Sequence, residues 1–190
     1  MTAKYIDNME YFTQRDNKFS PSVACFPTSA AMAMEYVNGH IVTPDNMQLE
    51  DLIVRECLNL SKAEKNTLTS ENGSWIWNHR PFQVIPIMAY VCNKVAPVIK
   101  QSWSISFDAI KLSIDNNKPV VCLGNFKSIS SIGGHYNTII GYNDETNHVF
   151  TMDPWGNGYE NYAIKDGSNM YYDWSIFKQS DDNSYGLIFE

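Results

Sequence analysis

Apolar residues recur at helical spacing through the first part of the chain. The clearest example is the segment from 46 to 60, which carries apolar side chains at Met47, Leu49, Leu52, Ile53, Leu58 and Leu60. Further helices are expected over about 28–37, over about 87–95, and after Ser106, a residue type that caps helices. The segment 61–82 has no such period and is predicted to be irregular.

The last third of the chain has the patterns of strands. The runs GGHYNTIIGYN and HVFTMDPWG flank the turn NDETN, which predicts a hairpin. Other strands are expected near Tyr11, within 96–103, 120–126 and 161–174, and in the terminal YGLIFE. Helices that precede strands indicate an α+β fold and argue against alternating βα units.

Composition limits the classes of protein that fit. The 190 residues, of which 44% are hydrophobic, suffice for a single domain over 1–190. A net charge of −7 argues against binding of nucleic acid through a basic face. No run of about 18 apolar residues predicts a membrane span. The first residues do not resemble a signal peptide, so we expect the protein to be cytoplasmic, or released without a signal peptide.

Four cysteines are spread along the chain, and none of them forms a CxxC pair. A zinc site or a thioredoxin-like motif therefore has no support, and we expect neither a metal nor a cofactor. Without an export signal, free thiols are favoured over disulfides. The four residues are Cys25, Cys57, Cys92 and Cys122.

Cys25 stands where a polar loop turns into a helix. Pro27 suits a first helical position, and Gly39 suits the end of the same helix. A thiol at a helix N-terminus lies near unpaired N–H groups and the positive end of the helix dipole, which favour the thiolate. Cys25 is therefore our candidate nucleophile.

His135 and Asp153 lie on opposite arms of the predicted hairpin. With the turn centred near Asp144 or Glu145, position 135 faces 153 or 155, within side-chain reach. An aspartate there could accept the imidazole N–H and orient the histidine as a base. Taken singly, each residue would pass for an ordinary loop or turn residue.

Other residues near these positions could complete a site. Gln14, in the loop before the cysteine, could join the Cys25 N–H as a donor to an oxyanion. Gly133 and Gly134 allow close approach of a substrate to His135. Trp155 could line a cleft or shield the site, or could pack in the core.

The ordered motifs resemble the papain-fold cysteine peptidases, and among them the bacteriocin-processing (double-glycine) peptidase-like family. The matching stretches are QRDN, ACFPTSAAMAMEY, GGHYNTIIGYN and VFTMDPWGN, and the resemblance spans nearly all of the chain. The resemblance implies a helical lobe, about 1–115, packed on an antiparallel β lobe, about 116–190, with the active site in a cleft between them.

By the same resemblance Cys25 would be the nucleophile, His135 the base, Asp153 the orienting acid and Gln14 an oxyanion donor. The substrate would be a peptide or, as for bacterial and phage relatives, a peptidoglycan stem peptide. The family usually has glycine after the cysteine, where this chain has Phe26. We expect the Phe26 ring to narrow the cleft or to alter the entry into the helix, and so to affect the choice of substrate.

Two other functions fit the same residues. An acyltransferase or transglutaminase-like enzyme would use the same triad and pass the acyl group to an amine. A catalytically silent peptide-binding module would keep the fold, with Phe26 blocking the cleft. The sequence leaves the oligomeric state unknown.

Overall fold

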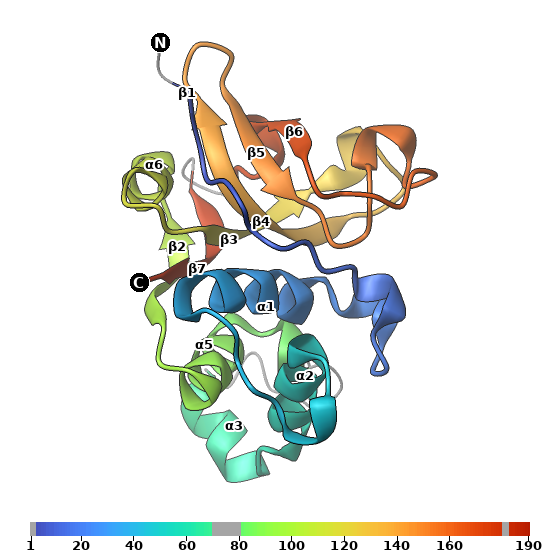
Figure 1. Ribbon diagram of the computed structural model, residues 1–190, viewed down its shortest axis with the longest axis vertical. Coiled ribbons are helices and arrows are strands. Elements are labelled where there is room, and N and C mark those ends of the chain that lie inside the picture. Colours follow the sequence, from blue (N-terminus) through green and yellow to red (C-terminus); the bar gives the residue numbers. More distant parts are fainter. Residues whose placement is uncertain (1–2, 70–80, 180–182) are drawn as a thin grey trace.

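The protein is built from a group of helices packed against one antiparallel sheet (Figure 1). The computed structural model describes residues 3–69, 81–179 and 183–190. Its α-helices are α1 (Cys25–Asn38), α2 (Leu49–Asn59), α3 (Lys62–Leu68), α5 (Ile85–Val95) and α6 (Phe107–Asp115). This arrangement confirms the predicted α+β class.

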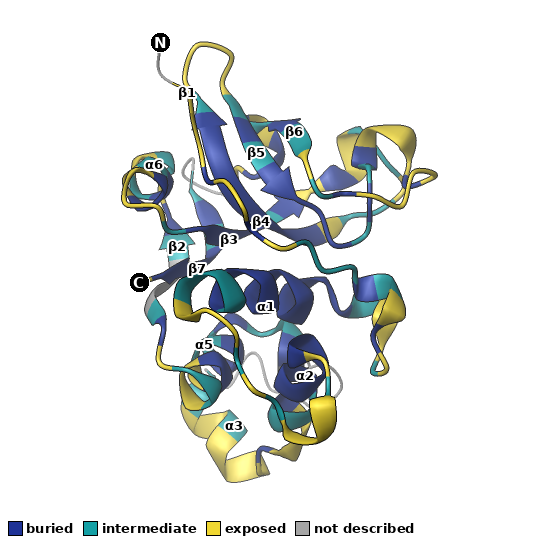
Figure 2. Ribbon diagram, in the orientation of Figure 1, coloured by how far each residue is buried: buried dark blue, intermediate teal, exposed yellow. Residues whose placement is uncertain are grey.

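Helix α1 lies at the centre of the molecule, with β4 on one side and α2 and α5 on the other (Figure 1). Every residue from Cys25 to Met34 is buried, and Figure 2 shows the helix dark along most of its length. Alanine and serine side chains along it allow neighbouring elements to approach closely. Gly39 ends the helix in the predicted place, with a φ of 73° that suits glycine.

The sheet has seven strands among the described residues, and the path β2-β7-β3-β4-β5-β6 runs from one edge to the other. All of its pairings are antiparallel. The strands are β1 (Ala3–Tyr5), β2 (Ile99–Ile105), β3 (Val120–Asn125), β4 (Gly134–Asn143), β5 (His148–Met152), β6 (Met170–Asp173) and β7 (Ser184–Phe189).

Strand β4 organises the sheet, because β5 pairs along one of its edges while β3 and β1 share the other. The short strand predicted near Tyr11 was misplaced: the strand in this part of the chain is β1, and Tyr11 lies in a loop. β1 and β2 both precede residue 115 yet belong to the sheet. The helical and β parts are therefore interleaved in sequence.

The helices differ from the prediction in some of their bounds and in one additional helix. Helix α1 begins at Cys25, so Pro27 is its third residue, where a missing N–H still costs nothing. Helix α3 lies inside the segment predicted to be irregular. Ser61 and Glu64 form a capping box at its start. The spacing of apolar residues does not reveal such a cap, so the prediction missed this helix. The rest of that segment, 70–80, lies outside the described residues.

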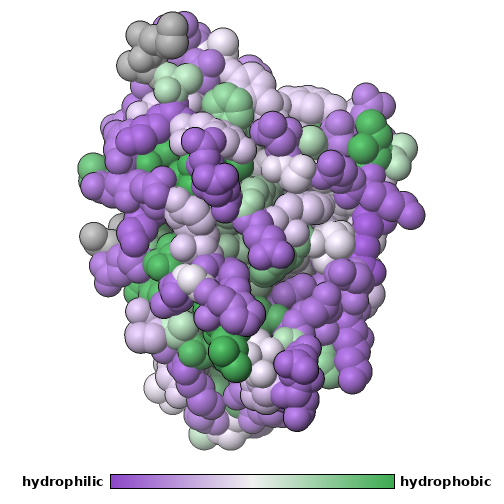
Figure 3. All heavy atoms as spheres, viewed as in Figure 1, coloured by the Kyte–Doolittle hydropathy of each residue, from purple (hydrophilic) through white to green (hydrophobic). Residues whose placement is uncertain are grey.

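The face of the molecule shown in Figure 3 gives little sign of a large apolar contact area. Hydrophilic residues predominate on the face shown in Figure 3, where the hydrophobic patches are small and separated. Within the described part of the chain, none of the helices is both long enough and apolar enough to cross a membrane.

Gly186 provides a test of the packing between β7 and β3. A Cβ at this position would lie 1.7 Å from the carbonyl oxygen of Val121, so Gly186→Ala must push the two strands apart. We expect a loss of about 1–3 kcal/mol in the free energy of unfolding, measured by urea denaturation. At Gly134 a Cβ would meet only ordinary contact, at 3.5 Å, so Gly134→Ala serves as the control. Equal stability of the two variants would contradict this packing.

Candidate active site

His135 and Asp153 form a buried pair at the end of the β4–β5 hairpin. The imidazole Nε2 lies 2.7 Å from Asp153 Oδ1. The exposed fractions of the two residues are 3% and 0%, so the pair is shielded from water. With Nε2 engaged by the carboxylate, Nδ1 is the nitrogen left to exchange a proton with another group.

The register of the hairpin explains this pairing. Thr138 pairs with Met152, and His135 lies three residues before Thr138 on β4. Continued in the same register, His135 is a diagonal neighbour of Asp153, which is one of the two alternatives expected from the sequence. Pro154 follows at once and ends the strand.

Further donors hold the carboxylate of Asp153. The backbone N–H of Trp155 donates to Oδ1 at 2.9 Å, and the hydroxyl of Tyr172 donates to Oδ2 at 3.0 Å. The backbone N–H of Asp153 donates to the carbonyl of Gly167 at 2.8 Å. Tyr172 was missed by the sequence analysis, because its contact depends on how β6 pairs with β5.

Opposing effects act on the pKa of His135. Burial lowers it, whereas the charge of Asp153, the hydrogen bond to Asp153 and the interactions with Cys25 raise it, to about 10. The raising effects win because the carboxylate is in direct contact and the site is dry. The imidazole therefore holds a proton at neutral pH.

Cys25 is the first residue of α1, so its backbone N–H has no carbonyl partner within the helix. The residue is 7% exposed, and its interaction with His135 is one of the effects that raise the pKa of the imidazole. Hydrogen bonds between α1 and β4 fix this approach. Ser29 Oγ donates to the carbonyl of Tyr136 at 3.1 Å, and Thr138 Oγ1 donates to the carbonyl of Ser29 at 2.9 Å.

Phe26 does not line an accessible cleft, in contrast to the expectation from its place in the sequence. Its side chain is fully buried and stacks on the ring of Tyr136, with centroids 3.9 Å apart and planes 6° from parallel. The ring therefore reinforces the contact between α1 and β4. Because it cannot reach a bound peptide in this structure, blocking of the site by Phe26 has no support.

Gln14 is buried in a short turn upstream of the cysteine. Its side-chain Nε2 donates to the carbonyl of Pro21 at 2.7 Å, and its backbone N–H donates to the carbonyl of Pro154 at 3.0 Å. The first bond orients the amide and uses one of its two N–H groups. The other is available to a further acceptor. Gln14 Oε1 is buried and has no hydrogen-bond partner among the described residues.

Trp155 packs with the turn that carries Gln14. The guanidinium of Arg15 lies 3.9 Å from the centre of the Trp155 ring and donates to the Trp155 carbonyl from Nε and Nη2, at 2.9 and 2.7 Å. The ring is only partly buried. Trp155 therefore borders the site and joins the upstream turn to the hairpin.

Gly133 and Gly134 lie immediately before His135. A Cβ at either would meet other side chains only at ordinary distances of 3.4 and 3.5 Å. The protein's own packing therefore does not demand glycine here, and Gly134 is exposed. The contact of Gly133 and Gly134 with a substrate therefore stays a prediction.

The other three cysteines lie in the core, and all four thiols are free, which confirms the prediction that free thiols are favoured over disulfides. Burial raises the pKa of Cys57, Cys92 and Cys122, to about 12 for the last two. These thiols therefore stay protonated and unreactive at neutral pH. Within the described part of the chain, no group of His, Cys, Asp or Glu residues is arranged to hold a metal ion.

Comparison with known families gives a match over most of the chain. Residues 6–181 match the model of the Peptidase_C39 like family. The chain belongs to this family. As a C39-like protein it is a hydrolase of the papain-like cysteine peptidase class.

One solved structure supports the fold. A crystal structure assigned as a C39-like peptidase from Bacillus anthracis superposes with a TM-score of 0.61 at 14% identity, covering 100% of this chain and 98% of that one. Xylellain, a cysteine protease from Xylella fastidiosa, gives a TM-score of 0.47 at 13% identity over 99% of this chain and 85% of its own. A comparison with curated proteins finds no match.

The His135–Asp153 pair predicts a pH dependence of stability. Because the pKa of His135 is raised, its contribution is complete below about pH 6.5 and is lost as pH rises toward about 10. In a Cys25→Ala background, where the thiol adds no proton of its own, the free energy of unfolding should fall by up to about 2 kcal/mol more between pH 7 and 8.5 with Asp153 present than with Asp153→Asn. Urea denaturation at both pH values measures the difference. Parallel changes in the two proteins would contradict the coupling.

Proposed function

We propose that this C39-like protein hydrolyses a peptide or amide bond through a Cys25–His135–Asp153 triad, with Gln14 as an oxyanion donor. The observation that carries the proposal is the buried contact of 2.7 Å between His135 and Asp153, next to a cysteine at a helix start. Family membership supports the reaction class, and the geometry supports these residues as its agents.

The proposed reaction has two stages. At the start the proton of the Cys25 thiol already lies on His135, so that the two rest as an ion pair, and the sulfur attacks the carbonyl carbon to form a tetrahedral intermediate. The Cys25 N–H and the Gln14 amide hold its oxyanion. His135 then protonates the leaving amine, and a thioester remains on Cys25. Water, deprotonated by His135, attacks the thioester and releases the acid, which restores the free sulfur of Cys25 and the protonated imidazole.

The substrate we propose is a peptide, by analogy with the family. A peptidoglycan stem peptide is a narrower candidate, which would suit a cell-wall peptidase of bacterial or phage origin. The net charge of −7 gives the protein no long-range attraction to anionic cell walls. A soluble peptide is therefore the first substrate to test. A peptide-library screen identifies the bond that is cleaved, and a turbidity assay on bacterial walls tests the narrower candidate.

Product analysis distinguishes hydrolysis from acyl transfer. With an added primary amine, a hydrolase still releases mainly the acid, whereas an acyltransferase gives mainly the amide. A thiol-directed peptide probe should label Cys25 if the site is catalytically competent. An unlabelled Cys25 in a folded protein would favour a silent binding module.

Replacing Cys25 by alanine should abolish hydrolysis, because the other three thiols are buried and protonated and cannot form the thioester. We expect turnover of the cleaved library peptide to fall by about 10³-fold or more, with the circular dichroism spectrum retained. Cys57→Ser is the matched control, since its thiol is buried away from His135. Full turnover in purified Cys25→Ala protein would refute the assignment of Cys25 as the nucleophile.

Replacing Gln14 by alanine should lower kcat by about 10²-fold, the usual effect of losing one oxyanion donor, with a smaller change in KM. Gln83 offers a close control, since its Nε2 donates to the carbonyl of Val23 at 3.1 Å, in the same short segment that Gln14 contacts. Gln83→Ala should keep kcat near the wild-type value. A similar loss of kcat in both variants would mean that Gln14 only holds that segment in place and does not stabilise the oxyanion.

A further inference from the structure

The two oxygens of Asp153 are held by different parts of the fold. Oδ1 accepts hydrogen bonds from His135 and from the backbone of Trp155. Oδ2 accepts one from the hydroxyl of Tyr172, which lies on β6 at the edge of the sheet. An edge strand thus adds a side chain to a site otherwise built from α1, β4, the end of β5 and the upstream turn.

We propose that Tyr172 is a positioning residue of this site, which holds the carboxylate of Asp153 in the orientation that pairs it with His135. The inference rests on the proposed function, because the orientation of His135 matters to the reaction only if His135 is the base. Tyr172 acts through Asp153 and is assigned no contact with a substrate.

The structure fixes the hydroxyl of Tyr172 from several directions. The residue is fully buried, and its hydroxyl accepts a hydrogen bond from the backbone N–H of Gly158 at 2.8 Å. With that bond in place, the hydroxyl hydrogen is directed to Asp153. The ring also packs edge-on against Phe126, with centroids 5.1 Å apart, and Phe126 in turn packs edge-on against His135 at 5.4 Å.

Tyr172 remains a donor across the working pH range. Its pKa is raised by burial first and by the negative charge of Asp153 second, so the phenol keeps its proton. Other ionisable groups near the pair are Cys25 on α1, Tyr11, whose hydroxyl donates to the carbonyl of Asp153, and Tyr162 in the loop between β5 and β6. Burial raises the pKa of both Tyr11 and Tyr162, so these phenols keep their protons at neutral pH.

Tyr162 provides an internal comparison. Its ring lies edge-on to His135 with centroids 5.8 Å apart, and its hydroxyl is buried without a hydrogen-bond partner among the described residues. A Cβ on Gly158 would lie 2.9 Å from the hydroxyl of Tyr172 and 3.3 Å from that of Tyr162. Two buried phenols thus lie beside the same glycine, but Tyr172 is the one that bonds Asp153.

The test is Tyr172→Phe in the full chain, which removes the hydroxyl and keeps the ring. We expect the pKa of His135 to fall by about one pH unit, because without the hydroxyl of Tyr172 the carboxylate of Asp153 can rotate away from the imidazole and then stabilises its charged form less. NMR titration follows this pKa, and the His135→Gln variant assigns the signal. We expect kcat/KM to fall about tenfold, with the alkaline limb of its pH profile shifted the same way.

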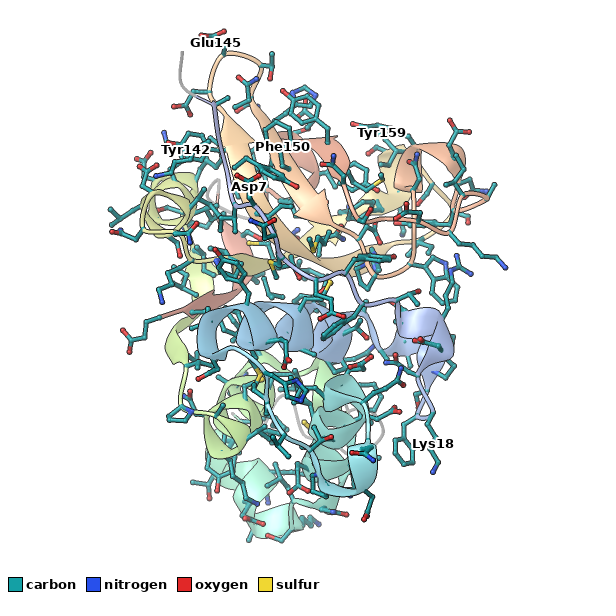
Figure 4. The ribbon with its side chains drawn as sticks, in the orientation of Figure 1. Asp7, Lys18, Tyr142, Glu145, Phe150 and Tyr159 are labelled. Carbon is teal, nitrogen blue, oxygen red and sulfur yellow. The ribbon has the colours of Figure 1, made fainter. Side chains whose placement is uncertain are left out.

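Two controls separate positioning from a general loss of structure. Tyr142→Phe removes a phenol that also bonds a carboxylate, Asp115 at 2.9 Å, but on the side of β4 that faces α6 (Figure 4). It should keep kcat/KM at the wild-type value. Tyr162→Phe removes the unbonded hydroxyl and should leave the pKa of His135 unchanged.

Gly158→Ala is a second route to the same result, because its Cβ would displace the hydroxyl of Tyr172. It should shift the pKa of His135 in the same direction. An unchanged pKa in Tyr172→Phe, even with lower thermal stability or activity, would overturn the positioning role. Since the NMR titration needs no substrate, it decides this point even if the wild type fails to hydrolyse peptides, which would refute the proposed function instead.

Discussion

The contact between α1 and β4 is the constraint on which the rest of the site depends. Phe26, directly after Cys25, stacks on Tyr136, directly after His135, and the hydrogen bonds of Ser29 and Thr138 continue the contact one turn further on. A helix that slid or turned against the strand would break the stacking and both bonds at once. The distance between the proposed nucleophile and base is therefore set by core packing, which is stiff, and not by loops.

Burying a carboxylate and an imidazolium is costly unless both are paired and fully hydrogen-bonded. The fold meets this requirement at Asp153 with three donors that come from β4, from the turn after β5 and from β6. An apolar pair of similar volume would fill the same space at no electrostatic cost. The retention of a charged pair at this position is thus better explained by chemistry than by stability.

The sequence was most informative where local chemistry decides structure. A cysteine before helix-forming residues, a hairpin turn and a histidine–aspartate spacing suffice to predict α1 and the His135–Asp153 pair. The sequence was least informative where distant segments meet. The burial of Phe26 depends on how α1 packs on β4, and the role of Tyr172 on the pairing of β6 with β5. Neither feature leaves a periodic pattern in the chain.

The turn around Gln14 joins the two halves of the molecule. On one side its backbone and Arg15 bond the residues that follow Asp153. On the other side Asn17 donates to Thr28 on α1, and Asp51 of α2 accepts from the N–H groups of Lys18 and Phe19, both at 3.0 Å. The proposed oxyanion donor is thus tied to the helix that carries the cysteine and to the hairpin that carries the base. Its position is set during folding, so a bound peptide would meet a site whose polar groups are already oriented, and reorganisation would add little to the barrier.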